Sequence, residues 1–319
     1  MIDFRYHLVS IVSIFLALAV GIVLGAGPLK GELGATLNKE VAGLRKDKAD
    51  LNKQLGEARA GVEARDSYIA DTNPIMLAGV LANRRVALVV LPGSDAAVAE
   101  ATAATLRSSG AAVVSTTSVS EDWVTDDQAT GAKRDAAVRA AAGEAGVDVS
   151  DSGSLAPRDL LLSTLLTVPS TQPPRALAPP TAQKGLDALA AADLIKIDTE
   201  GFELADLVVV VSGVTTRGDP AARQQAAERW VDLVIALDSR STGALVSAEA
   251  TTAGNGVSVI ETVRNDATAT KGVSTVDNAG DAMGQASVVH ALREQAAGDV
   301  GQYGLAPGAD APYAPIPGS

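Results

Sequence analysis

Hydrophobic residues follow three successive patterns along this chain, and each pattern predicts a different kind of element. The first is an uncharged apolar run from Leu8 to Ala26, close to the N-terminus. As an α-helix this run would be about 28 Å long at about 1.5 Å per residue, close to the thickness of a bilayer's hydrocarbon core. It therefore predicts either a membrane-spanning helix or a secretion signal.

The length of the apolar run and the residues after it favour a retained anchor. A cleaved signal has an apolar core of about 7 to 15 residues followed by a pair of small residues at the cleavage site. A cut after Gly27 would place Pro28 directly after the broken bond, and a cut after Ala26 would place bulky Leu24 at the third position before it. A cut after Gly25 stays compatible with the sequence. We predict that residues 1–28 form a short N-terminal tail and a transmembrane anchor in the cell membrane, with a removed signal as the alternative.

The second pattern is a heptad repeat within residues 29–72. Its apolar positions recur in alternating steps of four and three residues, which is typical of a coiled-coil seam. The predicted seam consists of Leu37, Val41, Leu44, Lys48, Leu51, Leu55, Ala58, Val62, Arg65 and Ile69. β-Branched residues at several a positions with leucine at d favour a parallel two-stranded coil, so we predict a homodimer. A single amphipathic helix lying on its own domain is the alternative.

The third pattern begins after Asn73 and Pro74 and alternates strands with helices. Residues 86–91 (VALVVL) and 206–212 (DLVVVVS) are continuous apolar runs, typical of parallel strands buried on both faces of a sheet. Stretches typical of helices lie between and after them. We predict an α/β fold, a doubly wound three-layer domain over residues 73–298. Residues 299–319, rich in Gly, Pro and Ala, are predicted to form a flexible tail.

Composition excludes several classes of function. The net charge is −12 and no block is rich in Lys or Arg, which argues against binding of nucleic acid. The absence of cysteine removes disulfides, zinc-thiolate sites and cysteine nucleophiles together. With two histidines, His7 and His290, and three methionines, soft-metal ligands are scarce and no Ser/His/Asp set is indicated. We therefore predict no enzyme activity, no cofactor and no resident metal.

Polar residues near strand ends are the candidates for a binding surface. Neither PGSD at residues 92–95 nor SGVTTRGDP at residues 212–220 fits a dinucleotide or P-loop motif, so neither predicts a nucleotide site. Aspartate at such positions is commonly a helix cap or a turn former, and that interpretation competes with ligand binding. The candidate surface comprises Ser94, Asp95, Asp219, Ser274, Thr275, Asp277 and Asn278.

Several segments of the chain are distinctive: the N-terminal MIDFRYHLVSIVSIFLALAVGIVLGAGPL, then VALVVLPG, STVDNAG, and the ALREQAAG and GQYG segments. Together they resemble the actinobacterial MctB/SteB family of proteins called copper transporters, whose corynebacterial member is SteB. The resemblance implies a single anchor, with a coiled coil and α/β domain outside the cell. It also implies pairing with a SteA-like membrane protein at the septum and control of a peptidoglycan hydrolase.

From the residues and this resemblance we predict a non-enzymatic, dimeric scaffold or regulator of the cell envelope. The alternative is a component of copper transport or efflux. The numbers of basic residues on the two flanks of the apolar run leave its orientation open, so the extracytoplasmic location follows from the resemblance alone.

Overall fold

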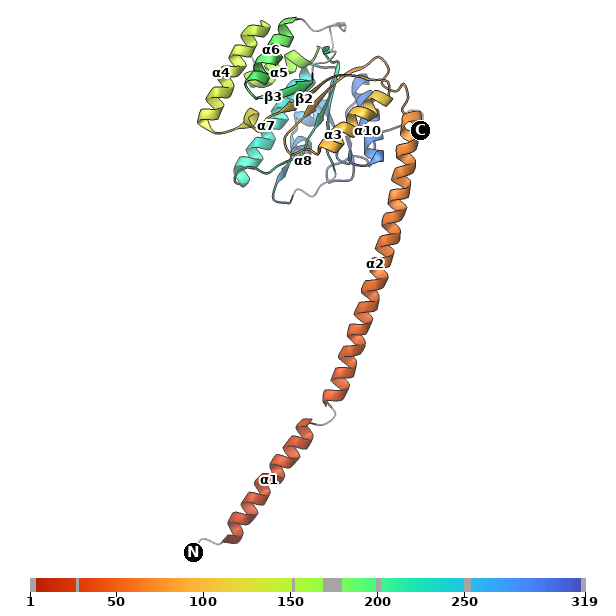
Figure 1. Ribbon diagram of the computed structural model, residues 1–319, viewed down its shortest axis with the longest axis vertical. Coiled ribbons are helices and arrows are strands. Elements are labelled where there is room, and N and C mark those ends of the chain that lie inside the picture. The colour runs from red at the N-terminus through yellow and green to blue at the C-terminus, as the bar shows by residue number, and fades with distance from the viewer. Residues whose placement is uncertain are drawn as a thin grey trace. The chain divides into compact units, whose positions relative to one another are not determined.

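The chain separates into two compact units, Met1–Arg65 and Asp66–Ser319. The computed structural model describes residues 4–26, 29–150, 153–168, 180–198, 202–249 and 254–316. The first unit holds helix α1 and most of helix α2. The second unit holds the end of α2 and an α/β domain (Figure 1).

Helix α1, Phe4–Ala26, contains the apolar run. Its stretch Phe4–Gly25 has a mean hydropathy of 2.8, and none of it is buried inside the structure. A helix of this length and composition can cross a membrane. The predicted N-terminal apolar helix is confirmed.

Helix α2, Leu29–Met76, runs without interruption past the point where the sequence predicted its end. Pro74 lies inside the helix, in its last turn. The backbone N–H of Leu77 still donates to the carbonyl of Asn73 at 2.8 Å, and the Asn73 side chain donates to the carbonyl of Ala282 at 2.8 Å. These two hydrogen bonds hold the last turn in place, so the proline does not break the helix there.

The α/β domain is built on a seven-stranded sheet. The strand order is β3-β2-β1-β4-β6-β8-β9, in which β3 is antiparallel to β2 and every other neighbouring pair is parallel. The strands are β1 (Arg85–Val90), β2 (Ala112–Val119), β3 (Ile195–Asp198), β4 (Leu207–Val211), β6 (Gly243–Ser247), β8 (Val273–Val276) and β9 (Gln302–Tyr303). A two-residue pair, β5 (Val214–Thr215) with β7 (Val257–Ser258), forms a separate antiparallel ribbon.

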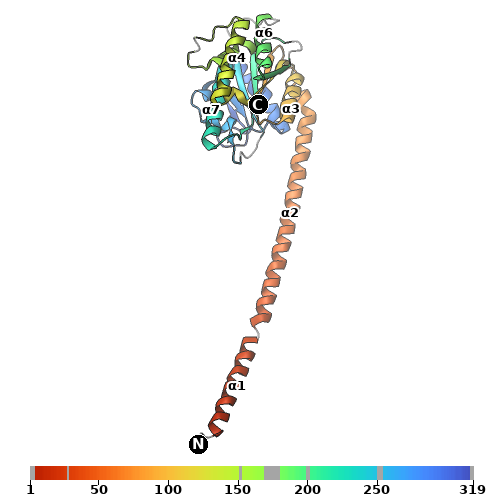
Figure 2. The ribbon, with the colours of Figure 1, turned by 60° about the vertical axis from the view of Figure 1, so that its left-hand side comes forward.

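Helices cover both faces of the sheet. In β1, Val86 and Leu88 pack in one core with α3 (Ala96–Ser108) and α10 (Ala282–Ala297), whereas Ala87 and Val89 pack in the other. The second core is covered by α4 (Gln128–Ala145), α5 (Pro157–Leu166), α6 (Pro180–Ala191), α7 (Pro220–Ser239) and α8 (Val259–Asn265), with α4 and α6 gathered on one side of the domain (Figure 2). The short helices η1 (Glu121–Val124) and α9 (Ala269–Gly272) complete the domain. The predicted three-layer α/β architecture is confirmed.

The C-terminal segment corrects the prediction of a flexible tail from residue 299. Strand β9 pairs in parallel with β8, and the N–H of Ala314, which is 1% exposed, donates to Ser287 Oγ at 2.7 Å. The carboxylate of Asp277 also accepts the backbone N–H groups of Leu305 and Ala306, at 2.7 and 3.0 Å. Glycines and prolines form turns here instead of a free tail, so the domain extends at least to residue 316.

A carboxyl group is buried in the core beneath α5. The indole N–H of Trp123 donates to Asp159 Oδ1 at 2.8 Å, and both residues are 0% exposed. The Arg158 guanidinium lies 3.3 Å from the same oxygen. Burial raises the pKa of Asp159 to about 6, against the lowering effects of Arg158 and of the Trp123 hydrogen bond.

The raised pKa predicts a pH-dependent loss of stability. Because the unfolded chain releases this proton near pH 3.8 and the folded chain near pH 6, the contribution of Asp159 to stability falls as pH rises through that window. From pH 5 to pH 7.5, the free energy of unfolding of the parent should fall by about 1 kcal/mol more than that of Asp159→Asn, as measured by urea unfolding at both pH values. Asp50→Asn, on an exposed part of α2, should keep the parental pH dependence. Equal pH dependence in Asp159→Asn and the parent would contradict this assignment.

Candidate functional site

The strand order places a topological switch point between β1 and β4. Strand β2 follows β1 on one side of that point, and β6 follows β4 on the other. The helices that make these connections, α3 and α7, lie on opposite faces of the sheet. In open α/β sheets, ligands bind outside the carboxyl ends of the strands at such a point.

Two glycines bring the loops after β1 and β4 into contact at this point. A Cβ on Gly213 would lie 1.9 Å from the carbonyl oxygen of Gly93, and a Cβ on Gly93 would lie 2.6 Å from the carbonyl oxygen of Val214. Gly93 and Val214 line two separate hollows, of about 320 and about 250 Å³. The contact between the loops therefore divides the crevice in which a dinucleotide would lie.

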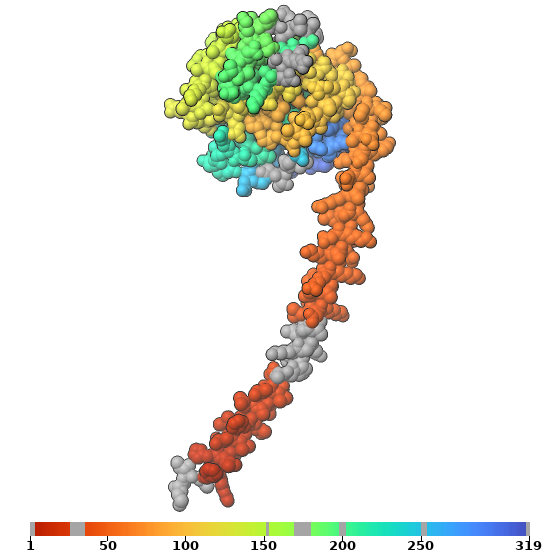
Figure 3. Space-filling view, in the orientation of Figure 1, coloured from red at the N-terminus to blue at the C-terminus, as the bar shows by residue number. Residues whose placement is uncertain are grey.

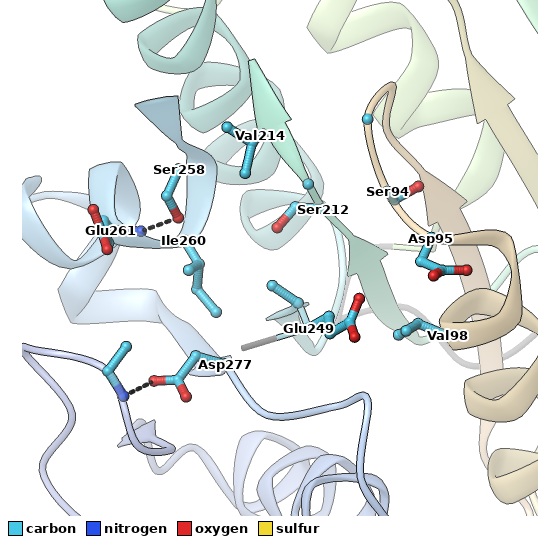
Figure 4. Close-up of a pocket in the computed structure, with 14 residues that line it drawn as sticks. Ser94, Asp95, Val98, Ser212, Val214, Glu249, Ser258, Ile260, Glu261 and Asp277 are labelled. Atoms are coloured by element: carbon cyan, nitrogen blue, oxygen red, sulfur yellow. Dashed lines mark hydrogen bonds between the residues drawn. The ribbon is translucent and has the colours of Figure 1, made fainter. Parts of the chain in front are cut away.

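We call the larger hollow the acidic pocket. Figure 4 shows Ser94 and Asp95 on one side of it, Ser258 and Glu261 on the opposite side, and Ser212 and Glu249 between them. Its lining comprises Gly93, Ser94, Asp95, Val98, Ser212, Gly213, Val214, Ala248, Glu249, Ser258, Ile260, Glu261, Asp277 and Ala306. The pocket thus collects residues that follow β1, β4, β6 and β8.

The charges of the acidic pocket disfavour an anion. Four carboxylates line it, and none of its lining residues is Lys, Arg or His. Asp277 is neutralised by Arg264, whose Nη1 donates to Asp277 Oδ2 at 2.7 Å. At the N-terminus of α3, Asp95 Oδ1 already accepts the N–H of Ala97 at 2.7 Å, so a carboxylate of the chain stands where a phosphate would otherwise bind.

Three of the residues predicted from sequence meet in this pocket, namely Ser94, Asp95 and Asp277. Asp219 is not among the lining residues. It forms the N-cap of α7, where its Oδ1 accepts the N–H of Ala222 at 2.9 Å. The competing interpretation of aspartate as a helix cap thus describes both Asp95 and Asp219.

Ser274 and Thr275 are fully buried in β8 and do not form an accessible surface. Ser274 Oγ accepts a hydrogen bond from the Gln295 side chain at 2.8 Å, and Thr275 Oγ1 donates to Gln302 Oε1 at 2.7 Å. Asn278 is also buried, and its amide lies 3.4 Å from both carboxylate oxygens of Asp281. Ser274 and Thr275 thus link β8 to α10 and to β9, whereas Asn278 makes a contact within the turn that leads to α10.

Sequence reasoning missed Glu249, Ser258 and Glu261; it pointed to the turn at residues 212–219 without naming Ser212 as a candidate. Ser212 and Glu249 follow the ends of β4 and β6 closely, so the rule that polar residues after buried strands share one edge could have found them. Ser258 and Glu261 have the spacing of a capping box, and the Glu261 N–H donates to Ser258 Oγ at 3.4 Å.

The described residues contain no group of three or more His, Cys, Asp or Glu side chains that could hold a metal ion. His290 lies in α10 and is 8% exposed, and burial, with a further contribution from Arg293, lowers its pKa. His7 lies on α1, in the other unit. Soft-metal sites usually combine several Cys, Met or His ligands, and the two histidines of this chain lie in different units.

These observations define a class of protein with an apolar N-terminal helix, a long exposed helix and an α/β domain that has an acidic pocket at its switch point. The sequence model of a family described as "Copper transport outer membrane protein, MctB" matches residues 1–314. The chain belongs to this family, which its description places in a membrane.

Curated relatives match over nearly their whole length. The chain is 28% identical over 315 residues to the copper transporter MctB of Mycobacterium bovis, a match that covers 97% of this chain and 98% of the relative. The same figures hold for the protein of that name from Mycobacterium tuberculosis. That of Mycobacterium leprae is 27% identical over 324 residues, with 97% and 98% covered.

Proposed function

We propose that this chain is a non-enzymatic scaffold or regulator of the cell envelope, anchored in the cell membrane by α1. The observation that carries the proposal is the exposed apolar seam on α2, where Leu44 and Leu51 are 67% and 63% exposed. An exposed apolar stripe on a helix is a docking surface for another helix, from a second copy of the chain or from a partner protein. A scaffold that acts through protein contacts needs such a surface.

The proposed location has the α/β domain outside the cell. Its support is the resemblance to SteB, because the charges that flank α1 leave both orientations open. The proposed partner is a SteA-like membrane protein, with which this chain would act at the septum to control a peptidoglycan hydrolase.

The chemistry of the acidic pocket supports a non-enzymatic role. The hydroxyl of Ser94 donates to the carbonyl of Leu91 at 2.7 Å, and that of Ser212 donates to the carbonyl of Ser247 at 3.4 Å. Activation of a serine nucleophile requires a neighbouring base. No imidazole or amine lines the pocket, so these hydroxyls act as hydrogen-bond donors within the fold.

The test is co-purification of the full-length chain from its native membranes. We expect the SteA-like protein to be recovered with the parent chain and to be at least about tenfold depleted with a Leu44→Asn/Leu51→Asn variant, which places polar groups on the seam. The matched control is Lys46→Asn/Lys53→Asn, two exposed positions on another face of the same helix, which should recover the partner as the parent does. Absence of the SteA-like protein from the parent sample, or equal recovery with the seam variant, would overturn the proposal.

A second candidate function, as a component of copper transport, is favoured by the comparisons. The matching family and the relatives are named for copper transport. In this role copper would be cargo, and the ligands would have to be assembled from several copies or from a partner, because the described residues of one chain hold no ligand cluster.

A further inference from the structure

The seam of α2 is an apolar stripe that the first unit leaves uncovered. Figure 3 shows the side chains of this part of α2 standing free along its length. The exposed apolar seam residues are Leu37 (55%), Val41 (39%), Leu44 (67%), Leu51 (63%), Leu55 (49%) and Val62 (56%). Water would have to solvate this stripe along four heptads, so burial against another helix is favourable.

The charges beside the seam distinguish between possible occupants. Acidic Glu40 and Asp47 occupy g positions, and basic Arg45 and Arg59 occupy e positions. In a parallel coil of two copies in register, each g residue faces the e residue five positions later in the other copy. Glu40 then faces Arg45 of the second copy, and both copies form this pair.

An antiparallel pair of copies would lose this opposite-charge contact. In that arrangement g positions face g positions and e positions face e positions, so acidic Glu40 and Asp47 could not face basic Arg45 or Arg59. Lys48, at an a position, also limits the number of copies, because two lysine side chains can reach water at the edge of a dimer more easily than three can in a trimer.

We propose that the seam of α2 is the docking surface for a second copy of this chain, in a parallel, in-register, two-stranded coiled coil. The inference deepens the proposed function, because it names the occupant of the surface on which that function rests. The glycines at positions 43, 56 and 61 each weaken the helix by about 1 kcal/mol, so the coil alone is marginal. Two α1 helices in one membrane raise the effective concentration of the seams and stabilise the pair.

The absence of cysteine from the chain allows a direct test of the register by disulfide formation. Leu44→Cys and Leu51→Cys are made separately in the full-length chain, and native membranes are treated with a mild thiol oxidant. Equivalent d positions of a parallel, in-register coil lie within disulfide distance. We expect each variant to form a covalent dimer, with a yield at least about fivefold above that of Lys46→Cys and Lys53→Cys on the outer face.

In an antiparallel pair, at most one of the two seam positions would lie opposite the same position of the other copy. Cross-linking of only one of the two cysteine variants would therefore overturn the proposal. Equal yields at seam and outer positions, or a disulfide to a different protein, would overturn it too. In the Leu44→Cys background, Glu40→Arg and Arg45→Glu should each lower the yield by about twofold or more, and the double exchange should restore it. Dimers without recovery of a SteA-like protein would support this inference while contradicting the proposed function.

Discussion

Replacement of Asp277 by alanine is expected to lower the free energy of unfolding of the α/β domain by about 3 to 5 kcal/mol. Asp277 and Arg264 form an ion pair of 2.7 Å in which both side chains are 2% exposed. The substitution leaves the Arg264 charge buried without its counter-ion. It also removes the acceptor for the backbone N–H groups of Leu305 and Ala306, so the C-terminal segment should loosen with it.

Both tryptophans, Trp123 and Trp230, are buried in the α/β domain, so fluorescence during urea unfolding of the detergent-solubilised full chain reports on this domain. The matched control is Glu121→Ala, which removes an exposed ion pair with Arg217 and should cost less than about 1 kcal/mol. Limited proteolysis of Asp277→Ala should cut first within residues 302–316. If the two variants proved equally stable, the buried pair would not hold this segment as described.

Gly213→Ala is expected to destabilise the domain by about 3 kcal/mol or more, because the added methyl group overlaps backbone atoms that cannot rotate away. Its Cβ would lie 1.9 Å from the carbonyl oxygen of Gly93 and 2.5 Å from the N–H nitrogen of Ser94. The loops after β1 and β4 would have to separate, which would also join the two hollows at the switch point.

The control is Gly143→Ala in the last turn of α4, where an added Cβ has no neighbour within 4 Å. That change should be neutral or stabilise the domain by up to about 1 kcal/mol, because alanine favours a helix more than glycine does. The two variants are compared by urea unfolding under the same conditions. Similar stabilities for the two would show that the loops do not need their close contact.

The hydrophobic pattern was sufficient to predict the α/β class, because β1 and β4 are continuous apolar runs in the middle of a sheet covered on both faces. It was not sufficient at the C-terminus. The order of residues 302–316 depends on Asp277 and Arg264, whose pairing lies in the tertiary structure and leaves no periodic signal in the sequence. The end of α2 was misplaced for a similar reason, because the hydrogen bond from the Asn73 side chain to Ala282 beside Pro74 is a tertiary contact that the local sequence does not show.

The candidate site was predictable to the extent that it follows strand ends. Ser94, Asp95 and Asp277 were found because polar residues after parallel strands gather at one edge of a sheet. Ser274 and Thr275 were chosen from the same motif as Asp277, but they lie within β8 and are buried. They are buried because β9 pairs with β8 and because the side chains of Gln295 and Gln302 cover them, and neither contact leaves a periodic signal in the sequence.

The names of the relatives point to copper transport, whereas our proposal rests on the exposed apolar side chains of α2. The central claim of our account is that the chain acts through contacts with proteins, and not by holding copper.

The most direct test of that claim is titration of the purified full-length chain with Cu(I) in detergent, in competition with a chelator of known affinity. Our account predicts no stoichiometric binding at submicromolar free copper, with the His290→Ala variant indistinguishable from the parent. Stoichiometric binding of Cu(I) in that range would contradict the account and establish the chain as a copper-handling protein.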